Sequence, residues 1–202
     1  RMVGDPTEGA LVVAAAKAGW VRTGEVPRFP RLAEVPFDSE RKRMVTVHGN
    51  PAEDGFPGGA PYIAVVKGAP DLVLGCCSTM ATAAGAVALT EAQRQEILAA
   101  NAAMASQALR VLAVAYRGLP EVPAEPKPSE VEQDLTLVGL IGMIDPARPE
   151  VLPAVKRAQG AGLRTIMVTG DYAATAAAIA EEIGVLQPGH GTISGTELEA
   201  MS

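Results

Sequence analysis

The chain is poor in aromatic residues and has no long apolar run. Its 202 residues include three Phe, three Tyr and one Trp, although 48% of the residues are hydrophobic. Alanine and branched aliphatic residues must therefore form the core, so that each aromatic ring stands out. The longest apolar segment, Leu135–Ile144, has the length of a strand, whereas a membrane-spanning helix needs about 20 apolar residues. We expect neither a membrane span nor a signal peptide in this sequence.

Basic charge and cysteine are also scarce. Asp and Glu number 23 against 17 Lys and Arg, which gives a net charge of −6 and no basic stripe, so nucleic acid is not an expected partner. Cys76 and Cys77 are adjacent, a spacing that suits neither a disulfide framework nor a zinc site. Because His48 and His190 are isolated as well, no metal site is expected.

Capping and turn residues mark helices and strands in the first two thirds of the chain. A helix is predicted from Pro6 to about Ala18, with Asp5 as N-cap, Glu8 at the capping-box position and Gly19 as its end. Strands are predicted over Arg31–Phe37, Lys42–His48, Tyr62–Lys67, Arg110–Tyr116 and Leu135–Ile144, helices after Pro70 and over Thr90–Gln107, and mobile segments over Asn50–Pro61 and Leu119–Pro128. The hairpin spacing favours an antiparallel sheet flanked by helices.

The pattern changes at Asp145. A helix after Pro149, a strand over Leu163–Val168 and a helix over about Ala173–Ile183 alternate in the way typical of a parallel, doubly wound sheet. The sequence therefore predicts an α/β protein of two domains joined by a hinge at Asp145–Pro149. The expected domains are residues 1–144 and the partial domain 145–202.

Five short motifs follow one another in a fixed order. They are GDPTEGA (Gly4–Ala10), PFDSERKRM (Pro36–Met44), VKGAP (Val66–Pro70), DPARPE (Asp145–Glu150) and MVTGD (Met167–Asp171). Each alone is weak evidence, but each can contact one part of a nucleotide or a phosphate. Together they resemble the P-type cation-transporting ATPases, with a nucleotide-binding domain followed by the start of a phosphorylation domain. The resemblance extends over the whole chain, and the bacterial calcium-type pumps are the most similar subgroup.

Several side chains in these motifs have the chemistry of a nucleotide site. Phe37 can stack on a purine, although an aromatic at a strand end is more often part of the core. Lys67 ends a strand, and Gly68 after it permits close approach of a ligand, although a solvated lysine is the common alternative. Lys42 and Arg110 are strand-end cations that can attract phosphates.

The resemblance assigns these side chains to ATP. It implies that Phe37 stacks on adenine and that Lys67 lines the adenosine pocket. It implies that Glu8 accepts a hydrogen bond from the adenine amine, with helix capping as the alternative, and that Lys42 and Arg110 contact phosphates. ATP is therefore the expected ligand, accompanied by Mg²⁺ in the intact protein.

A second group of residues lies at the phosphoryl-transfer end. The predicted strand Leu163–Val168 would deliver its following turn to the sheet edge where doubly wound folds bind ligands. The candidate phosphoryl-site residues are Thr169, Gly170 and Asp171. They resemble the second motif of the haloacid-dehalogenase-like fold, whereas an ordinary helix cap is the alternative. The resemblance also implies that Asp145 and Arg148 position ATP at the hinge, with an inter-domain ion pair as the alternative.

Two positions depart from the family pattern. Some animal calcium pumps carry an arginine two residues after the stacking Phe, where this chain has Ser39. One phosphate contact is then either missing or supplied by Arg41 or Arg43. Pump sequences commonly have Asn after the TGD motif, where this chain has Tyr172.

The resemblance implies a cytoplasmic, ATP-binding portion of an integral membrane pump of a bacterial-type plasma membrane. The phosphorylated DKTGT motif is absent from the sequence, so we expect ATP binding without turnover and a monomeric fragment whose partner is the remainder of the pump. A haloacid-dehalogenase-like phosphatase is one alternative, but Asp5 and Asp38 stand in the wrong contexts for its nucleophile. A stand-alone nucleotide-sensing module is the other.

Overall fold

The computed structural model describes residues 5–20, 28–51, 56–144, 147–170 and 173–201. The chain divides into two compact units. The sheet unit comprises Arg1–Leu98 and Leu112–Ile141, and the C-terminal unit comprises Ala99–Val111 and Gly142–Ser202. The domain boundary expected at residue 145 stays a prediction.

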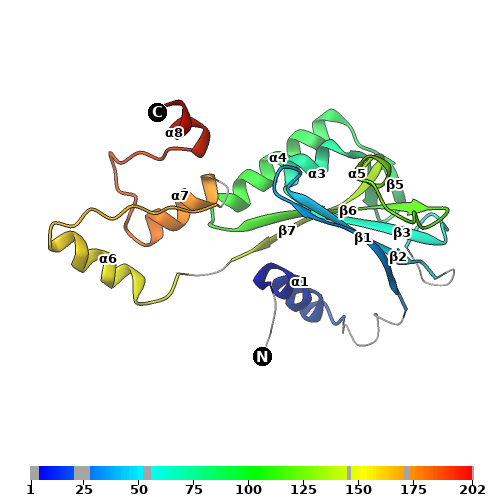
Figure 1. Cartoon of the computed structure of the whole chain (residues 1–202), viewed down its shortest axis with the longest axis horizontal. Coiled ribbons are helices and arrows are strands. Elements are labelled where there is room, and N and C mark those ends of the chain that lie inside the picture. The colour runs from blue at the N-terminus through cyan, green and yellow to red at the C-terminus, as the bar shows by residue number, and fades with distance from the viewer. Residues whose placement is uncertain (1–4, 21–27, 52–55, 145–146, 171–172, 202) are drawn as a thin grey trace. The chain divides into compact units, whose positions relative to one another are not determined.

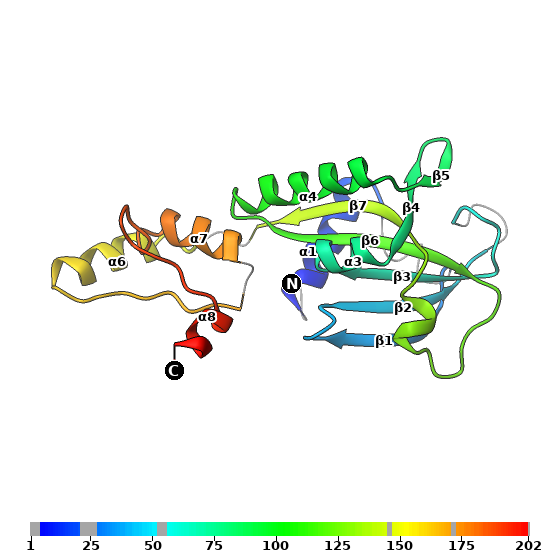
Figure 2. The same cartoon turned by 90° about the horizontal axis from the view of Figure 1, so that it is seen from above.

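A seven-stranded sheet within the described residues forms the body of the sheet unit (Figures 1 and 2). Its strands are β1 (Arg31–Asp38), β2 (Arg43–Gly49), β3 (Tyr62–Gly68), β4 (Cys77–Thr82), β5 (Gly85–Ala88), β6 (Arg110–Leu119) and β7 (Leu135–Met143), in the order β1-β2-β3-β6-β7-β4-β5. Strands β1, β2, β3 and β6 pair antiparallel, as do β4 and β5, whereas β4 runs parallel to β7. The expected α/β class, with a mostly antiparallel sheet flanked by helices, is confirmed.

Helices lie on both sides of this sheet. They are α1 (Pro6–Lys17), α3 (Pro70–Gly75), α4 (Glu91–Ala105) and α5 (Pro128–Val131), followed in the C-terminal unit by α6 (Val151–Gly160), α7 (Ala173–Glu182) and α8 (Gly195–Ala200). Helix α1 lies on one side of the sheet, and α3 and α5 lie on the other (Figure 1). We call the side of α3 and α5 the core face and the side of α1 the open face.

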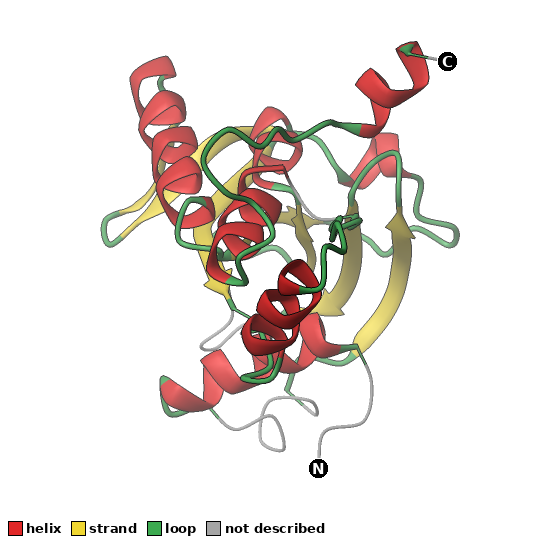
Figure 3. Cartoon of the chain, turned by 90° about the vertical axis from the view of Figure 1, so that its left-hand side faces the viewer, coloured by secondary structure: helices red, strands yellow, loops and turns green. Residues whose placement is uncertain are grey.

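The core face buries the aliphatic side chains of the strands. Val45, Val47 and Val66 are fully buried there, together with Val73 of α3 and Val131 of α5. The strands, yellow in Figure 3, curve and twist around these side chains, as branched aliphatic residues on a pleated sheet favour.

Local signals in the sequence account for the ends of two helices. Asp5 accepts a hydrogen bond from the Thr7 amide at 2.7 Å and so caps α1, which ends before Gly19 with a φ of 86°. At the start of α4, the Thr90 amide donates to Gln93 Oε1 at 2.9 Å and the Gln93 amide donates to Thr90 Oγ1 at 3.3 Å. Both predicted caps are thus confirmed, as are the predicted strands of β1, β2, β3, β6 and β7 and the helices α3, α6 and α7.

The segment expected to be a mobile loop before β3 is anchored where the structure describes it. Asn50 Nδ2 donates to the Ala60 carbonyl at 2.8 Å, and the Phe56 amide donates to Asn50 Oδ1 at 2.7 Å. The Phe56 ring also packs against Tyr116 with 5.5 Å between centroids. Four short elements, namely β4, β5, α5 and α8, were not foreseen by the sequence reasoning.

The strand predicted over Leu163–Val168 is wrong. The segment is extended but belongs to no sheet among the described residues, and Leu163, Ile166 and Val168 are 63%, 78% and 92% exposed. A strand needs a neighbour that satisfies its backbone N–H and C=O groups. No described strand pairs with this segment, which is why its apolar pattern alone does not produce one.

The helices of the C-terminal unit are held by side-chain contacts to backbone. Gln159 of α6 donates to the Gly184 carbonyl at 2.9 Å, and the buried hydroxyl of Thr175 in α7 donates to the Leu109 carbonyl at 3.2 Å. Ser194 and Glu197 form a capping box at the start of α8. Among the described residues, no helix combines the length and the apolar character needed to cross a bilayer.

Candidate functional site

An irregularity in β1 places Phe37 on the open face. Val35 pairs with Val45 and Asp38 pairs with Arg43, so β1 has one residue more than β2 between the two pairs. Such a β-bulge reverses the alternation of side chains. Regular alternation from the buried Val35 would point Phe37 into the core, whereas after the bulge its ring is 62% exposed. The alternative of a core aromatic is therefore wrong.

Lys67 lies in the same row of the open face, two strands away. Met44 pairs with Lys67, and their neighbours Val45 and Val66 are buried on the core face. Residues 44 and 67 therefore point to the open face, as Phe37 does. Two strand spacings separate the backbones of Phe37 and Lys67 by about 10 Å, a gap that one nucleoside fills.

Helix α1 brings Glu8 to this row. The Lys67 ammonium contacts both oxygens of the Glu8 carboxylate across 59 residues of sequence. The Glu8 side chain is 53% exposed and that of Lys67 is 20% exposed, so the pair is accessible to solvent. An exposed pair of this kind contributes about 0–1 kcal/mol, so a ligand can rearrange it at little cost. Asp5 caps the helix, while the Glu8 carboxylate is directed at Lys67.

Lys42 and Gly68 meet at the end of the hairpin. The Lys42 amide donates to the Asp38 carbonyl at 2.7 Å, and the Lys42 carbonyl accepts from the Ala69 amide at 2.9 Å. A Cβ atom on Gly68 would approach the Lys42 carbonyl oxygen to 2.4 Å. Gly68 is therefore needed for contact between two chain segments, a reason different from the open approach for a ligand that we expected. The Lys42 side chain is exposed.

Both arginines considered as substitutes for the missing phosphate contact have another partner. Arg43 Nε donates to Glu132 Oε2 at 2.7 Å, and Arg41 Nη1 contacts Glu132 Oε1. The Glu132 side chain is 2% exposed. Because a buried carboxylate needs its cations, this arrangement weighs against Arg41 or Arg43 as a phosphate ligand. Sequence reasoning missed Glu132, which is 91 residues from Arg41 and in no motif.

The remaining phosphate candidates belong to the C-terminal unit. Arg110 begins β6 with an exposed side chain, and Arg148 is exposed just before α6. Asp145 lies outside the described residues. Their roles at a nucleotide stay predictions.

The predicted phosphoryl site is described only in part. Thr169 and Gly170 are exposed at the end of the extended segment, and α7 begins at Ala173. Asp171 lies outside the described residues. The role of these three residues stays a prediction.

Ionisation separates the hairpin turn from the thiols. Asp38 Oδ1 accepts the amides of Arg41 at 2.8 Å and Glu40 at 3.0 Å, and the Arg41 hydrogen bond is the main cause that lowers the pKa of Asp38. Burial raises the pKa of Cys77 to about 12 and also raises that of Cys76. Both thiols are therefore protonated at neutral pH and poor nucleophiles.

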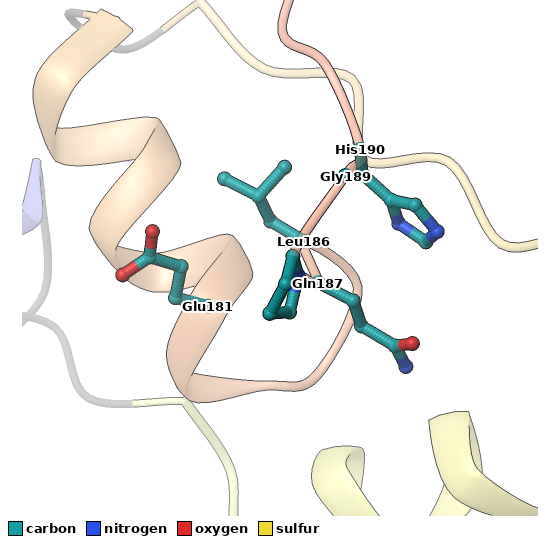
Figure 4. Close-up of a pocket in the computed structure, with 6 residues that line it drawn as sticks. Glu181, Leu186, Gln187, Gly189 and His190 are labelled. Carbon is teal, nitrogen blue, oxygen red and sulfur yellow. The ribbon is translucent and has the colours of Figure 1, made fainter.

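A hollow in the C-terminal unit offers no comparable convergence of groups. It is lined by Glu181, Leu186, Gln187, Pro188, Gly189 and His190. The Gln187 amide and the His190 ring point away from the Glu181 carboxylate (Figure 4). Within the described part of the chain, no group of three or more His, Cys, Asp or Glu side chains could hold a metal ion.

Comparison with known proteins assigns most of the sheet unit to one family. The family model described as "P-type ATPase, cytoplasmic domain N" matches residues 1–150.

Curated relatives match almost the whole chain. The chain is 38% identical over 202 residues to calcium-transporting ATPase 1 of Lactococcus lactis, a match that covers 100% of this chain and 22% of the relative. It is 38% identical over 199 residues to the calcium-transporting ATPase of Bacillus subtilis, with 98% and 22% covered. It is 39% identical over 201 residues to the cation-transporting ATPase pma1 of Synechocystis, with 99% and 21% covered. The chain thus spans about a fifth of the length of these relatives.

Proposed function

Because the chain belongs to the P-type cation-transporting ATPases, we propose that it binds ATP on the open face of its sheet and presents it to an aspartate elsewhere in a calcium-type pump. One observation supports this most strongly. The bulge in β1 exposes Phe37 in the same row as Lys67, which α1 joins to Glu8. A stacking ring, an acceptor and a cation are the groups that an adenosine pocket needs.

In this proposal each group of the row has one task. Phe37 stacks on adenine, Glu8 accepts the hydrogen bond of its exocyclic amine, and Lys67 meets the ribose and the first phosphate. Lys42 and Arg110 attract the remaining phosphates. The contact between Glu8 and Lys67 then rearranges when the nucleotide enters between them. Catalysis by the intact pump would depend on this positioning of ATP.

Mg²⁺ would accompany the nucleotide in the intact pump and neutralise charge on its phosphates. The described residues offer no carboxylate cluster that would hold the ion by itself. The phosphate oxygens of ATP are therefore its natural ligands here. This chain's own contribution is to hold the adenosine end.

We infer that the C-terminal unit is the start of a haloacid-dehalogenase-like phosphorylation domain, beginning near residue 145. Its extended segment exposes Leu163, Ile166 and Val168, an apolar pattern that pairing with further strands would cover. The remainder of the pump is then the partner that supplies those strands. Thr169, Gly170 and Asp171 would bind the phosphoryl group, and Asp145 and Arg148 would orient ATP, on the cytoplasmic side of a bacterial-type membrane.

Titration of the 202-residue chain with ATP and with adenosine, followed by amide NMR and calorimetry, tests the pocket. Phe37→Ala should weaken both ligands by about fivefold to a hundredfold, because loss of one stacked aromatic costs about 1–3 kcal/mol per base. Lys67→Ala should weaken ATP more than adenosine, since the ammonium interacts with phosphate charge.

Two variants control for nonspecific effects. Trp20→Ala removes another exposed aromatic residue, and Lys127→Ala removes a lysine on α5 whose side chain is 70% exposed. Both should bind ATP as the parent does. Unchanged ATP binding in both Phe37→Ala and Lys67→Ala would remove the proposed pocket. Covalent phosphorylation of this chain at an aspartate by labelled ATP would contradict binding without turnover.

A further inference from the structure

We propose that Glu132 is a positioning residue of the nucleotide site, which holds Lys42 in place through Arg41 and Arg43. The proposal rests on the proposed function, because it concerns the phosphate end of the same site. Glu132 itself lies on the core face after α5 and has no path to a ligand on the open face.

The Glu132 carboxylate is a buried charge with two obligatory partners. Its side chain is 2% exposed, Arg43 Nε donates to one oxygen at 2.7 Å, and Arg41 Nη1 contacts the other. Leaving one member of such a buried set without its partner is strongly unfavourable, so the set stays assembled in the folded protein. We call these three side chains the Glu132 clamp.

The two arginines of the Glu132 clamp flank Lys42 directly. Lys42 has a φ of 48°, a left-handed conformation that a residue with a side chain adopts only when its surroundings enforce it. Its amide donates to Asp38 and its carbonyl accepts from Ala69. With Arg41 and Arg43 fixed on either side, the Lys42 backbone is held at four points, and its side chain leaves the hairpin in one direction.

The same arrangement divides the work among three neighbouring cations. Arg41 and Arg43 are matched by Glu132, whereas the exposed Lys42 ammonium forms no ion pair within the described part of the chain. Lys42 is therefore the member of this group that is available to a polyanion. A lysine on a flexible stem binds a phosphate well only if its backbone is fixed.

This role predicts an effect opposite in sign to simple electrostatics. Removing a carboxylate near a site for a polyanion normally strengthens attraction, since it makes the local potential more positive. Loss of the Glu132 carboxylate should weaken ATP binding, because it frees the segment that carries Lys42. Adenosine lacks the phosphates that Lys42 would contact, so its binding should not change.

The decisive experiment compares Glu132→Gln with Glu130→Gln in the 202-residue chain. Glu130 is on the same helix, its side chain is 52% exposed, and its substitution changes the net charge equally. Glu132→Gln should raise the Kd for ATP about fivefold and leave the Kd for adenosine within about twofold. Glu130→Gln should leave both unchanged. Glu132→Asp, which keeps the charge but shortens the side chain, should give an intermediate loss of ATP affinity and guards against failure of Glu132→Gln to fold.

The outcomes separate positioning from general stability. Unchanged or tighter ATP binding by both Glu132 variants overturns the proposal, and so does an equal loss of ATP and adenosine binding, which would indicate a structural role only. If the parent chain binds neither ligand, the proposed function fails, and amide hydrogen exchange then decides on the Glu132 clamp. Glu132→Gln should speed exchange at Lys42 and Ala69 relative to Val66 in β3, and equal exchange would refute the Glu132 clamp.

Discussion

The two units of the molecule bury their apolar side chains to very different extents. In the sheet unit, Val45, Val66 and Leu135 are completely buried beneath a sheet with helices on both sides. In the C-terminal unit, the buried apolar side chains are alanines, whereas Ile166 and Val168 are exposed. The burial of apolar area is the main stabilising contribution to folding. The comparison teaches that the adenosine row rests on a completed core, while the predicted phosphoryl site lies beside an unpaired segment.

Thiol labelling should show the largest contrast between the units. With its pKa raised to about 12 by burial, Cys77 should react with iodoacetamide at pH 8 on the order of a thousandfold more slowly than an ordinary cysteine. A cysteine introduced by Val168→Cys, at a position that is 92% exposed, should react at the ordinary rate. Mass spectrometry of the labelled peptides measures both rates. Rapid labelling of Cys77 in the native chain would mean that the sheet unit opens readily.

The same leucine-to-alanine change should have unequal effects in the two units. Leu135→Ala creates a cavity in the sheet core and should cost about 2–5 kcal/mol of unfolding free energy. Leu163→Ala, at a position 63% exposed, should change it by less than about 0.5 kcal/mol. Urea unfolding followed by circular dichroism measures both, with Trp20 fluorescence reporting the sheet unit. Equal destabilisation by the two variants would show that the extended segment is buried in solution.

Within the sheet unit, two glycines give a sharper contrast. Gly68→Ala places a Cβ atom 2.4 Å from the Lys42 carbonyl oxygen, whereas a Cβ atom on Gly75 meets nothing within 4 Å. Overpacking of this kind costs about 1–3 kcal/mol, and here it should also displace Lys42 and weaken ATP binding. Gly75→Ala, at the end of α3, should leave both quantities nearly unchanged. Parent-like stability and ATP affinity in Gly68→Ala would contradict the proposed contact.

The sequence predicted what local signals encode. The caps of α1 and α4 and the alternation in β2 and β3 depend on residues a few positions apart, and the structure confirms them. The exposure of Phe37 depends on a bulge that becomes visible only from the pairing of β1 with β2. The motif as a whole, and not alternation, therefore led to this residue.

Long-range partners could not be predicted in the same way. Glu132 is 89 residues from Arg43, and nothing around it in the sequence signals a buried carboxylate. The segment Leu163–Val168 failed as a predicted strand for the converse reason. Its local pattern favours a strand, but pairing depends on a neighbour that no pattern within the segment supplies.

Acidification should give the smallest contrast, between one carboxylate in each unit. The Arg41 amide lowers the pKa of Asp38, and the Ser194 hydroxyl lowers that of Glu197. Because each pKa is lower when folded than the ordinary value of about 4, each group stabilises its fold above that pH and ceases to do so as pH falls through the folded pKa.

Protonation of Asp38 should loosen the turn that carries Lys42, whereas protonation of Glu197 should affect only the first turn of α8. Carboxyl-carbon NMR of the parent, Asp38→Asn and Glu197→Gln measures the two titrations. Amide shifts of Lys42 that follow the Asp38 titration and persist in Glu197→Gln would support separate control of the two units. Shifts of Lys42 that vanish in Glu197→Gln would instead couple α8 to the nucleotide turn and contradict this separation.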